Sequence, residues 1–301
     1  MALTAIALVL LSAVLHVAWN LLVKSSADPR AFMAVKGIPF LALGAGALIW
    51  IPLDALPPAL WACVILSGLL HTGYVIALSN AYTVGDLSLV YPIARSAPAF
   101  IPIAAYFILG ERISLATGAG IAVVVVCILV LQLSTAGGSL GKGWRALFNP
   151  GSFARNVWAY VTLASVVAYS LTDKSGMDLF RGVESIDGLL RAPIYFVLEN
   201  ALCYGLYWSW ISIRGGVEVR QVLRTEWKFA LLAALGTLVS YSLILYVFET
   251  EPVSTVVALR QSSVLVAVVA GWLWLGEPAG RLRLLASAAL FAGLTLVAIA
   301  S

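Results

Sequence analysis

Apolar residues gather in ten stretches along this chain, and polar residues and prolines separate the stretches. A helix that spans a bilayer needs about 20 mostly apolar residues, because each adds about 1.5 Å across a hydrocarbon core of about 30 Å. The stretches cover residues 3–23, 31–51, 58–82, 87–109 and 113–133 in the first half, and 156–174, 192–213, 227–248, 253–275 and 281–300 in the second. The pattern predicts an all-α integral membrane protein with ten transmembrane helices.

Three polar segments between these stretches are longer than the others. They cover residues 134–155, 175–191 and 214–226, and each is too short to fold as a soluble domain. The first apolar stretch lacks the basic start of a secretory signal and continues to about Val23, so we expect a retained helix.

One tripeptide occurs near the end of each half of the chain. Leu109-Gly110-Glu111 and Leu275-Gly276-Glu277 lie 166 positions apart, and each precedes one further apolar stretch. The same shift places Gln261, with Arg260 beside it, over Arg95. These matches predict that the protein contains one membrane unit twice.

A second match lies at the start of each half. The segment His16–Ser25 resembles Val166–Ser175 with a shift of 150 positions, and the longer loop after Lys174 accounts for the different shift. We therefore expect a first five-helix repeat over residues 1–134, a connecting loop over 135–155 and a second five-helix repeat over 156–301. Because each repeat has an odd number of spans, the two repeats must be inverted in the membrane, as in many secondary transporters.

Composition excludes a soluble globular protein. The chain is 62% hydrophobic and 11% charged, with a mean hydropathy of +1.00, whereas soluble domains are about 45–50% apolar and about 25% charged. The lipid bilayer is therefore one expected partner. The net charge of +4 comes from scattered residues rather than basic tracts, so we expect no nucleic-acid partner. The segment Gly137–Gly143 resembles a phosphate-binding loop but lacks its Ser/Thr, and we expect no cofactor.

Several short motifs together resemble a known family. They are Trp19-Asn20 with Lys24 at the end of the first span, Pro92-Ile93-Ala94 with Ser96 in the fourth, and the two Leu-Gly-Glu tripeptides. In this order and spacing they resemble the EamA-type ten-helix permeases of the drug/metabolite transporter superfamily. The resemblance implies a central cavity lined by the first four helices of each half, transport of a small-molecule metabolite, and residence in a bacterial plasma membrane.

Two arginines inside predicted spans are the strongest candidates for a binding site. Arg95 and Arg260 occupy nearly equivalent positions in the two repeats, and Tyr91 lies one turn before Arg95. An arginine fork suits a carboxylate, phosphate, phosphonate or sulfonate group. The alternative is that each arginine pairs with a carboxylate and only fixes helix packing. The predicted substrate-binding residues are Trp19, Asn20, Tyr74, Tyr91, Arg95, Tyr169, Tyr241, Arg260 and Gln261.

Three residues are candidates for proton coupling: Glu199, His16 and His71. An acid within a span is costly and usually functional, although Glu199 could instead form a structural ion pair with Lys36 in the equivalent second span. The histidines could shuttle protons or simply pack through hydrogen bonds. We expect no metal site, because no His, Cys and carboxylate residues cluster along the sequence.

The two Gly-Glu pairs are interpreted as hairpin caps. A glycine ends a helix readily in the left-handed conformation, and Glu111 or Glu277 would then lie near the N-terminus of the next helix, where the dipole favours negative charge. A role in transport is the alternative. Eleven Lys and Arg residues follow odd-numbered spans and four follow even-numbered spans, which favours both termini outside, whereas the family resemblance implies both inside.

The sequence therefore predicts a permease that moves a small anionic or zwitterionic metabolite by alternating access, and it leaves proton coupling open. A homodimer is left open. One rival is a non-transporting membrane subunit or scaffold. The other is a membrane-embedded enzyme, although the chain contains no HExxH motif, and we expect no enzymatic activity.

Overall fold

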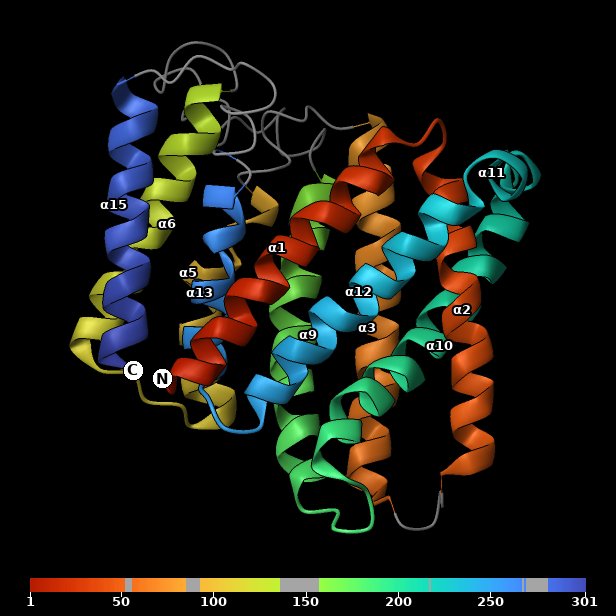
Figure 1. The fold of residues 1–301 in the computed structure, drawn as a ribbon, viewed down its shortest axis with the longest axis horizontal. Helices are drawn as coiled ribbons and strands as arrows, with labels where there is room; N and C mark the ends of the chain where they lie inside the picture. Colours follow the sequence, from red (N-terminus) through yellow and green to blue (C-terminus); the bar gives the residue numbers. More distant parts are fainter. Residues whose placement is uncertain (52–55, 85–92, 136–156, 217, 267, 269–280) are drawn as a thin grey trace.

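A computed structural model describes the protein except for residues 52–55, 85–92, 136–156, 217, 267 and 269–280 (Figure 1). For residues 82–84, 132–135 and 281–283 it describes the backbone alone. Every regular element in the described part is a helix. The first half contains α1 (Leu3–Ser25), α2 (Pro29–Trp50), α3 (Pro58–Val84), α5 (Ala97–Leu109) and α6 (Leu115–Thr135); the second contains α9 (Val157–Arg181), α10 (Gly188–Arg214), α11 (Val219–Thr225), α12 (Trp227–Phe248), α13 (Val253–Arg260) and α15 (Arg281–Ala300).

The helices have the length and surface of membrane spans. Four of the described helices are long and apolar enough to cross a bilayer: α1, α2, residues Pro58–Ala81 of α3, and α12. The described apolar parts of α5, α6, α13 and α15 are shorter. Large apolar side chains such as Phe107, Leu115 and Ile213 are exposed on the outside, where lipid rather than water would cover them. The ten predicted spans correspond to these helices, with α11 as an additional short helix.

The packing of the helices follows a pseudo-twofold relationship between the halves. Helix α1 packs on α12, and the equivalent pair, α3 and α9, also packs together. Helices α2 and α10, α5 and α13, and α6 and α15 each pack against their own counterpart in the other half. This is the pattern of two inverted five-helix repeats, and it places the first four spans of each half around a common centre. The two termini lie side by side, with the Met1 amino group 2.6 Å from the Ser301 carbonyl oxygen.

Within the described residues, the fourth and ninth spans each contain a tight turn, whereas the sequence predicted continuous helices over 87–109 and 253–275. In the fourth, the Ser96 N–H donates to the Ile93 carbonyl in a tight turn before α5. In the ninth, α13 ends at Arg260, and the Gln261 N–H donates to the Ala258 carbonyl before the helix resumes. The two breaks are equivalent to within one residue, and both lie beside a candidate arginine.

Two predicted loops are partly helical. Helix α9 continues to Arg181, because Met177 and Phe180 are buried on one face while Lys174 and Asp178 form an i,i+4 ion pair of 2.6 Å on the other. The predicted loop 214–226 contains α11, which buries Val222. The sequence predictions for these two segments were wrong because their polar residues occupy only one helix face.

The first Leu-Gly-Glu tripeptide forms a cap, but not on the helix that was expected. Gly110 ends α5 in the left-handed conformation with φ of 66°, as predicted. The Glu111 carboxylate accepts hydrogen bonds from the Val253 and Ser254 N–H groups, at 2.9 and 3.2 Å. It therefore caps α13 of the other half rather than α6. The tripeptide Leu275-Gly276-Glu277 lies outside the described residues.

Candidate functional site

Two small neighbouring chambers lie at the centre of the helices. Their volumes are about 50 and about 100 Å³, which is room for a few water molecules each. Both chambers are lined by His16, Tyr74, Tyr169 and Arg260, so these residues form the boundary between them. The helices that carry these four residues come from both halves, as expected for a site between inverted repeats.

Lys36 is the most deeply buried cation in the described part of the chain. Its side chain comes from α2 and lines the smaller chamber, with Nζ 4.0 Å from the centre of the Trp19 ring. No carboxylate of the described residues lies within ion-pair distance of this ammonium group. The alternative of a structural ion pair between Lys36 and Glu199 is therefore not supported. A buried cation held only by an aromatic face is costly unless an anion joins it.

Arg260 at the end of α13 borders both chambers. One guanidinium nitrogen lies 3.3 Å from His16 Nδ1, and the guanidinium carbon lies 5.2 Å from the centre of the Tyr241 ring. Because arginine only donates, His16 Nδ1 accepts this hydrogen bond and is unprotonated. The described residues place no carboxylate in ion-pair distance of Arg260, so the packing alternative is not supported for this arginine.

Arg95 and Gln261 line the larger chamber together with Arg260. The Arg95 guanidinium donates to the Ser263 hydroxyl at 2.7 Å, which joins the two broken spans across the pseudo-twofold relationship. The structure thus brings the two candidate arginines to one chamber. Lys36, which the sequence suggested only as a partner for an acid, is a third cation and lines the neighbouring smaller chamber.

The other predicted site residues fall into three groups. Trp19, Tyr74, Tyr169 and Tyr241 line the chambers, as do the two histidines. Asn20 instead donates to the His16 carbonyl at 2.7 Å and contacts the ring of that histidine. Tyr91 lies outside the described residues.

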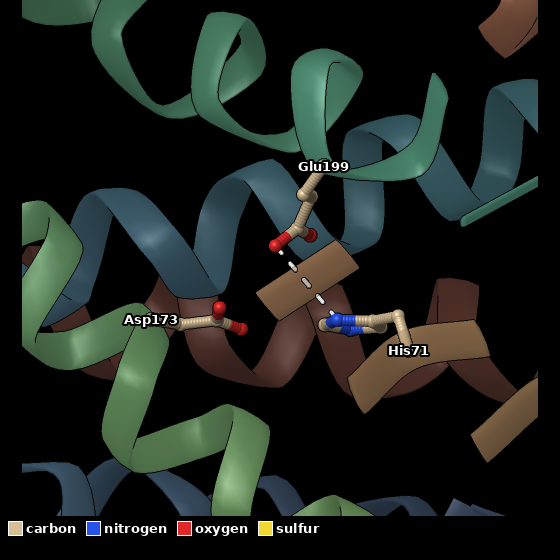
Figure 2. A group of neighbouring side chains, drawn as sticks. All are labelled: His71, Asp173 and Glu199. Atoms are coloured by element: carbon tan, nitrogen blue, oxygen red, sulfur yellow. Dashed lines mark ion pairs between the residues drawn. The ribbon is translucent and has the colours of Figure 1, made fainter. Parts of the chain in front are cut away.

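A second polar group lies beside the smaller chamber and contains two acids (Figure 2). His71 from α3, Asp173 from α9 and Glu199 from α10 point toward one another. Both acids are fully buried, and His71 Nδ1 lies 3.8 Å from Glu199 Oε2. Asp173 was not among the predicted site residues. In the repeat match, Asp173 corresponds to the apolar Val23. The replacement of an apolar residue by an acid was therefore a sequence signal that could have identified Asp173.

The Ser67 hydroxyl joins the members of this group, and the sequence analysis also missed it. It contacts Asp173 Oδ1 and Glu199 Oε2 at short hydrogen-bond distance, and it lies 3.1 Å from His71 Nδ1. Ser67 and His71 are one helical turn apart, and His71 Nδ1 also lies 3.1 Å from the Ser67 carbonyl oxygen. We call Ser67, Asp173 and Glu199 the carboxylate cluster.

These residue types also occur in metal sites, and their nitrogen and oxygen atoms lie within 4.8 Å of one another. The expectation that no such residues cluster is therefore wrong in three dimensions. The Ser67 hydroxyl, however, already lies between the two carboxylates and contacts both. Hydrogen bonds therefore account for the short distances in this cluster, and we interpret it as a hydrogen-bonded group.

Tyr241 connects the carboxylate cluster with the cations. Its hydroxyl donates to Asp173 Oδ2, and its ring faces the Arg260 guanidinium. Tyr169 stacks on His71 with ring centres 4.0 Å apart, and it also borders both chambers. The Tyr241 ring therefore lies next to both the positively charged chamber lining and the buried acid Asp173.

Comparison with known proteins identifies the family of this architecture. The family model described as "EamA-like transporter family" matches residues 2–133 and 192–299, so the match omits α9. Among solved structures, 27 chains match, and one of them, "Crystal structure of protein", superposes with a TM-score of 0.72 at 18% identity over 99% of this chain and 98% of its own. At this identity the likeness shows the fold alone. No curated protein matches.

Proposed function

Because the chain belongs to the EamA-like transporter family of the drug/metabolite transporter superfamily, we propose that it is a secondary transporter of a small anionic or zwitterionic metabolite. It is an integral multi-pass membrane protein, and we place it in a bacterial plasma membrane. The substrate binds in the two central chambers, between the halves. The chain acts as a carrier rather than as an enzyme or a scaffold.

The observation that supports an anionic substrate is the charge of the chamber lining. Lys36 is buried and Arg260 borders both chambers, and the described residues place no carboxylate in ion-pair distance of either cation. The Arg260 Nε–H and the Trp19 indole N–H also have no hydrogen-bond partner among the described residues. A carboxylate, phosphate, phosphonate or sulfonate group would satisfy both the charge and the donors.

The size of the chambers limits the substrate. Volumes of about 50 and about 100 Å³ admit a molecule of only a few heavy atoms in this conformation. A small carboxylic acid, an amino acid or a short phosphonate or sulfonate fits these limits. The aromatic rings of Trp19, Tyr74 and Tyr169 would contact its uncharged part.

The turns in the fourth and ninth spans support alternating access. The turns at Ser96 and Gln261 interrupt equivalent helices beside the cations, and inverted-repeat transporters bind their substrates at such interruptions. We propose that rocking of the halves about these turns opens the chambers first to one side of the membrane and then to the other.

The test is transport by purified protein in liposomes. Four labelled probes are offered separately for counterflow exchange: lactate, inorganic phosphate, 2-aminoethylphosphonate and taurine. We expect exchange of at least one probe, and loss of that exchange in Lys36→Met and Arg260→Gln. Arg214→Gln, at the exposed end of α10, is the matched control and should exchange normally. Exchange that survives both cavity substitutions would contradict the proposal.

A further inference from the structure

The carboxylate cluster contains fewer donor hydrogens than its contacts require. The Ser67 hydroxyl has one hydrogen, yet its oxygen lies at short distance from both Asp173 Oδ1 and Glu199 Oε2. If both acids were ionised, one carboxylate would face a serine lone pair without a hydrogen between them. Two negative charges would also be fully buried with only the Ser67 hydroxyl between them, and this costs a large amount of free energy.

One additional proton removes both conflicts. If Glu199 is protonated, its hydroxyl donates to Ser67, and Ser67 donates to Asp173. If Asp173 is protonated instead, the same chain of hydrogen bonds runs in the opposite direction. In either arrangement every short contact has one hydrogen, and the pair of acids has one negative charge rather than two.

The groups around the cluster allow such a shared proton. The described titratable and charged side chains that face it are Cys63 and His71 from α3, Tyr169 from α9, Tyr195 and Cys203 from α10, Tyr241 from α12 and Arg260 from α13. Tyr241 donates to Asp173 Oδ2, Asn200 lies 3.3 Å from Glu199 Oε1, and His71 Nδ1 lies 3.1 Å from the Ser67 carbonyl oxygen. None of these contacts displaces the Ser67 hydroxyl, which lies between the two acids.

We propose that Asp173 and Glu199 share one exchangeable proton through the Ser67 hydroxyl, and that this proton moves with the substrate anion as a symported ion. The second part, symport of the proton with the anion, rests on the proposed function. It assigns the coupling proton to the pair of acids, with Ser67 as the relay, and not to His16, whose Nδ1 accepts a hydrogen bond from Arg260.

The sign of the coupling follows from the position of Tyr241. Its ring lies between the Arg260 guanidinium and Asp173. An anion bound beside Lys36 and Arg260 offsets their positive charge, so a proton on the cluster becomes more favourable. A proton on the cluster in turn makes the chamber more positive and strengthens anion binding. This linkage is reciprocal, and it favours loading both together rather than exchanging one for the other.

The proton itself can be tested without a substrate. Infrared difference spectra of the purified protein at neutral pH should contain a protonated-carboxyl band that is absent from the Asp173→Asn/Glu199→Gln double variant. Ser67→Ala should shift this band, whereas Ser79→Ala, a buried serine on the same helix, should leave it unchanged. A wild-type spectrum with ionised carboxylates only would overturn the proposal. Zn²⁺ or Mn²⁺ that co-purifies with wild type and is lost from the double variant would also overturn it.

The coupling is tested with whichever probe of the lactate, phosphate, 2-aminoethylphosphonate and taurine set the liposomes exchange. An inward gradient of about one pH unit should drive about tenfold accumulation by wild type. The double variant should exchange the probe yet fail to accumulate it, while Asp178→Asn, on the same helix as Asp173, accumulates it normally. Accumulation by the double variant, or wild-type exchange that no pH gradient drives, would refute the symport while leaving the proposed function intact. Absence of exchange with all four probes would instead refute the proposed function, and the infrared spectra would then decide the proton site.

Discussion

The cationic chamber, by which we mean the space around Lys36 and Arg260, and the carboxylate cluster both carry charge at the centre of the helices, but they differ in how their charges are satisfied. Lys36 and Arg260 are held by aromatic faces and by a histidine nitrogen, without a carboxylate in ion-pair distance among the described residues. Asp173 and Glu199 are joined to each other through one serine hydroxyl. The first arrangement favours binding of an exchangeable anion, and the second favours binding of an exchangeable proton that the two acids share.

The charged side chains of the two regions come from different elements. Lys36 and Arg260 lie on α2 and α13, whereas Asp173 and Glu199 lie on α9 and α10. Tyr241 on α12 contacts both, with its ring toward Arg260 and its hydroxyl toward Asp173. Motion of the halves that displaces α12 would therefore change both regions together.

The largest effect is expected from removing the unpaired cation. Lys36→Met keeps the length of the side chain and removes its charge, so a substrate anion loses a desolvated contact that is typically worth about 2–5 kcal/mol. We expect kcat/KM for exchange to fall by about 100-fold or more. Lys228→Met, at the exposed start of α12, serves as the control and should change exchange by less than about twofold. A similar loss in both variants would show that the chamber charge is not specific.

Separating the two regions should have an intermediate effect. Tyr241→Phe keeps the ring against Arg260 and removes only the hydroxyl that donates to Asp173. A lost hydrogen bond to a charged group costs about 1.5–3 kcal/mol, so we expect about tenfold weaker proton-driven accumulation with exchange largely retained. Parallel assays measure the effect of the substitution on probe exchange and its effect on proton-driven accumulation. Equal losses in both assays would indicate a structural role for the hydroxyl alone.

The helix pair that carries Lys36 gives a test on stability. Gly37 on α2 packs so closely on α10 that an added Cβ would lie 2.3 Å from Tyr204 Cδ1, whereas a Cβ at Gly46 on the same helix meets nothing within 4 Å. Gly37→Ala should lower the free energy of unfolding by about 1–3 kcal/mol. Gly46→Ala should be neutral or slightly stabilising, because alanine favours helix. Thermal unfolding in detergent compares the two, and equal stability would mean that α2 and α10 are not in close contact.

The smallest effect concerns a third acid outside both regions. Burial raises the pKa of the Glu249 carboxyl, and the Arg191 guanidinium, 3.8 Å away, offsets part of this rise. The folded protein therefore holds this proton to higher pH than the unfolded chain, so this contribution to stability falls as pH rises above about 4.5.

Glu249→Gln should remove this dependence of the stability on pH. Its melting temperature should exceed that of wild type by an amount that grows as the pH is raised, with a difference in unfolding free energy below about 1 kcal/mol. Transport should be unchanged, in contrast to the two acids of the cluster. A pH-independent difference would show that Glu249 titrates alike in the folded and unfolded protein.

The number and position of most spans were predictable because apolar length alone determines them. The continuous α12 matched its prediction to the residue. The break in the fourth span has a partial signal in Pro98, which lacks an N–H. The break at Gln261 has none, since no proline lies within the described residues 253–266. That break follows from the tertiary environment of the repeat and not from local propensity.

The cationic chamber was partly predictable and the carboxylate cluster was not. Arg95 and Arg260 were found because the repeat register placed them together, whereas Lys36 was considered only as one alternative, an ion-pair partner for Glu199, and the two do not form an ion pair. Ser67 and Asp173 are 106 positions apart, and no sequence spacing connects them. Only the packing of α3 on α9 brings the hydroxyl and the acid together.

The central claim is that anion binding beside Lys36 and Arg260 and proton binding by Asp173 and Glu199 strengthen each other. Isothermal titration of the purified protein with the probe that it exchanges, in buffers of different ionisation enthalpy, counts the protons taken up for each anion bound. We predict uptake that rises toward one proton per anion as the pH is raised, and that disappears in the Asp173→Asn/Glu199→Gln variant. Proton release on anion binding, or the same uptake in the variant, would contradict the claim.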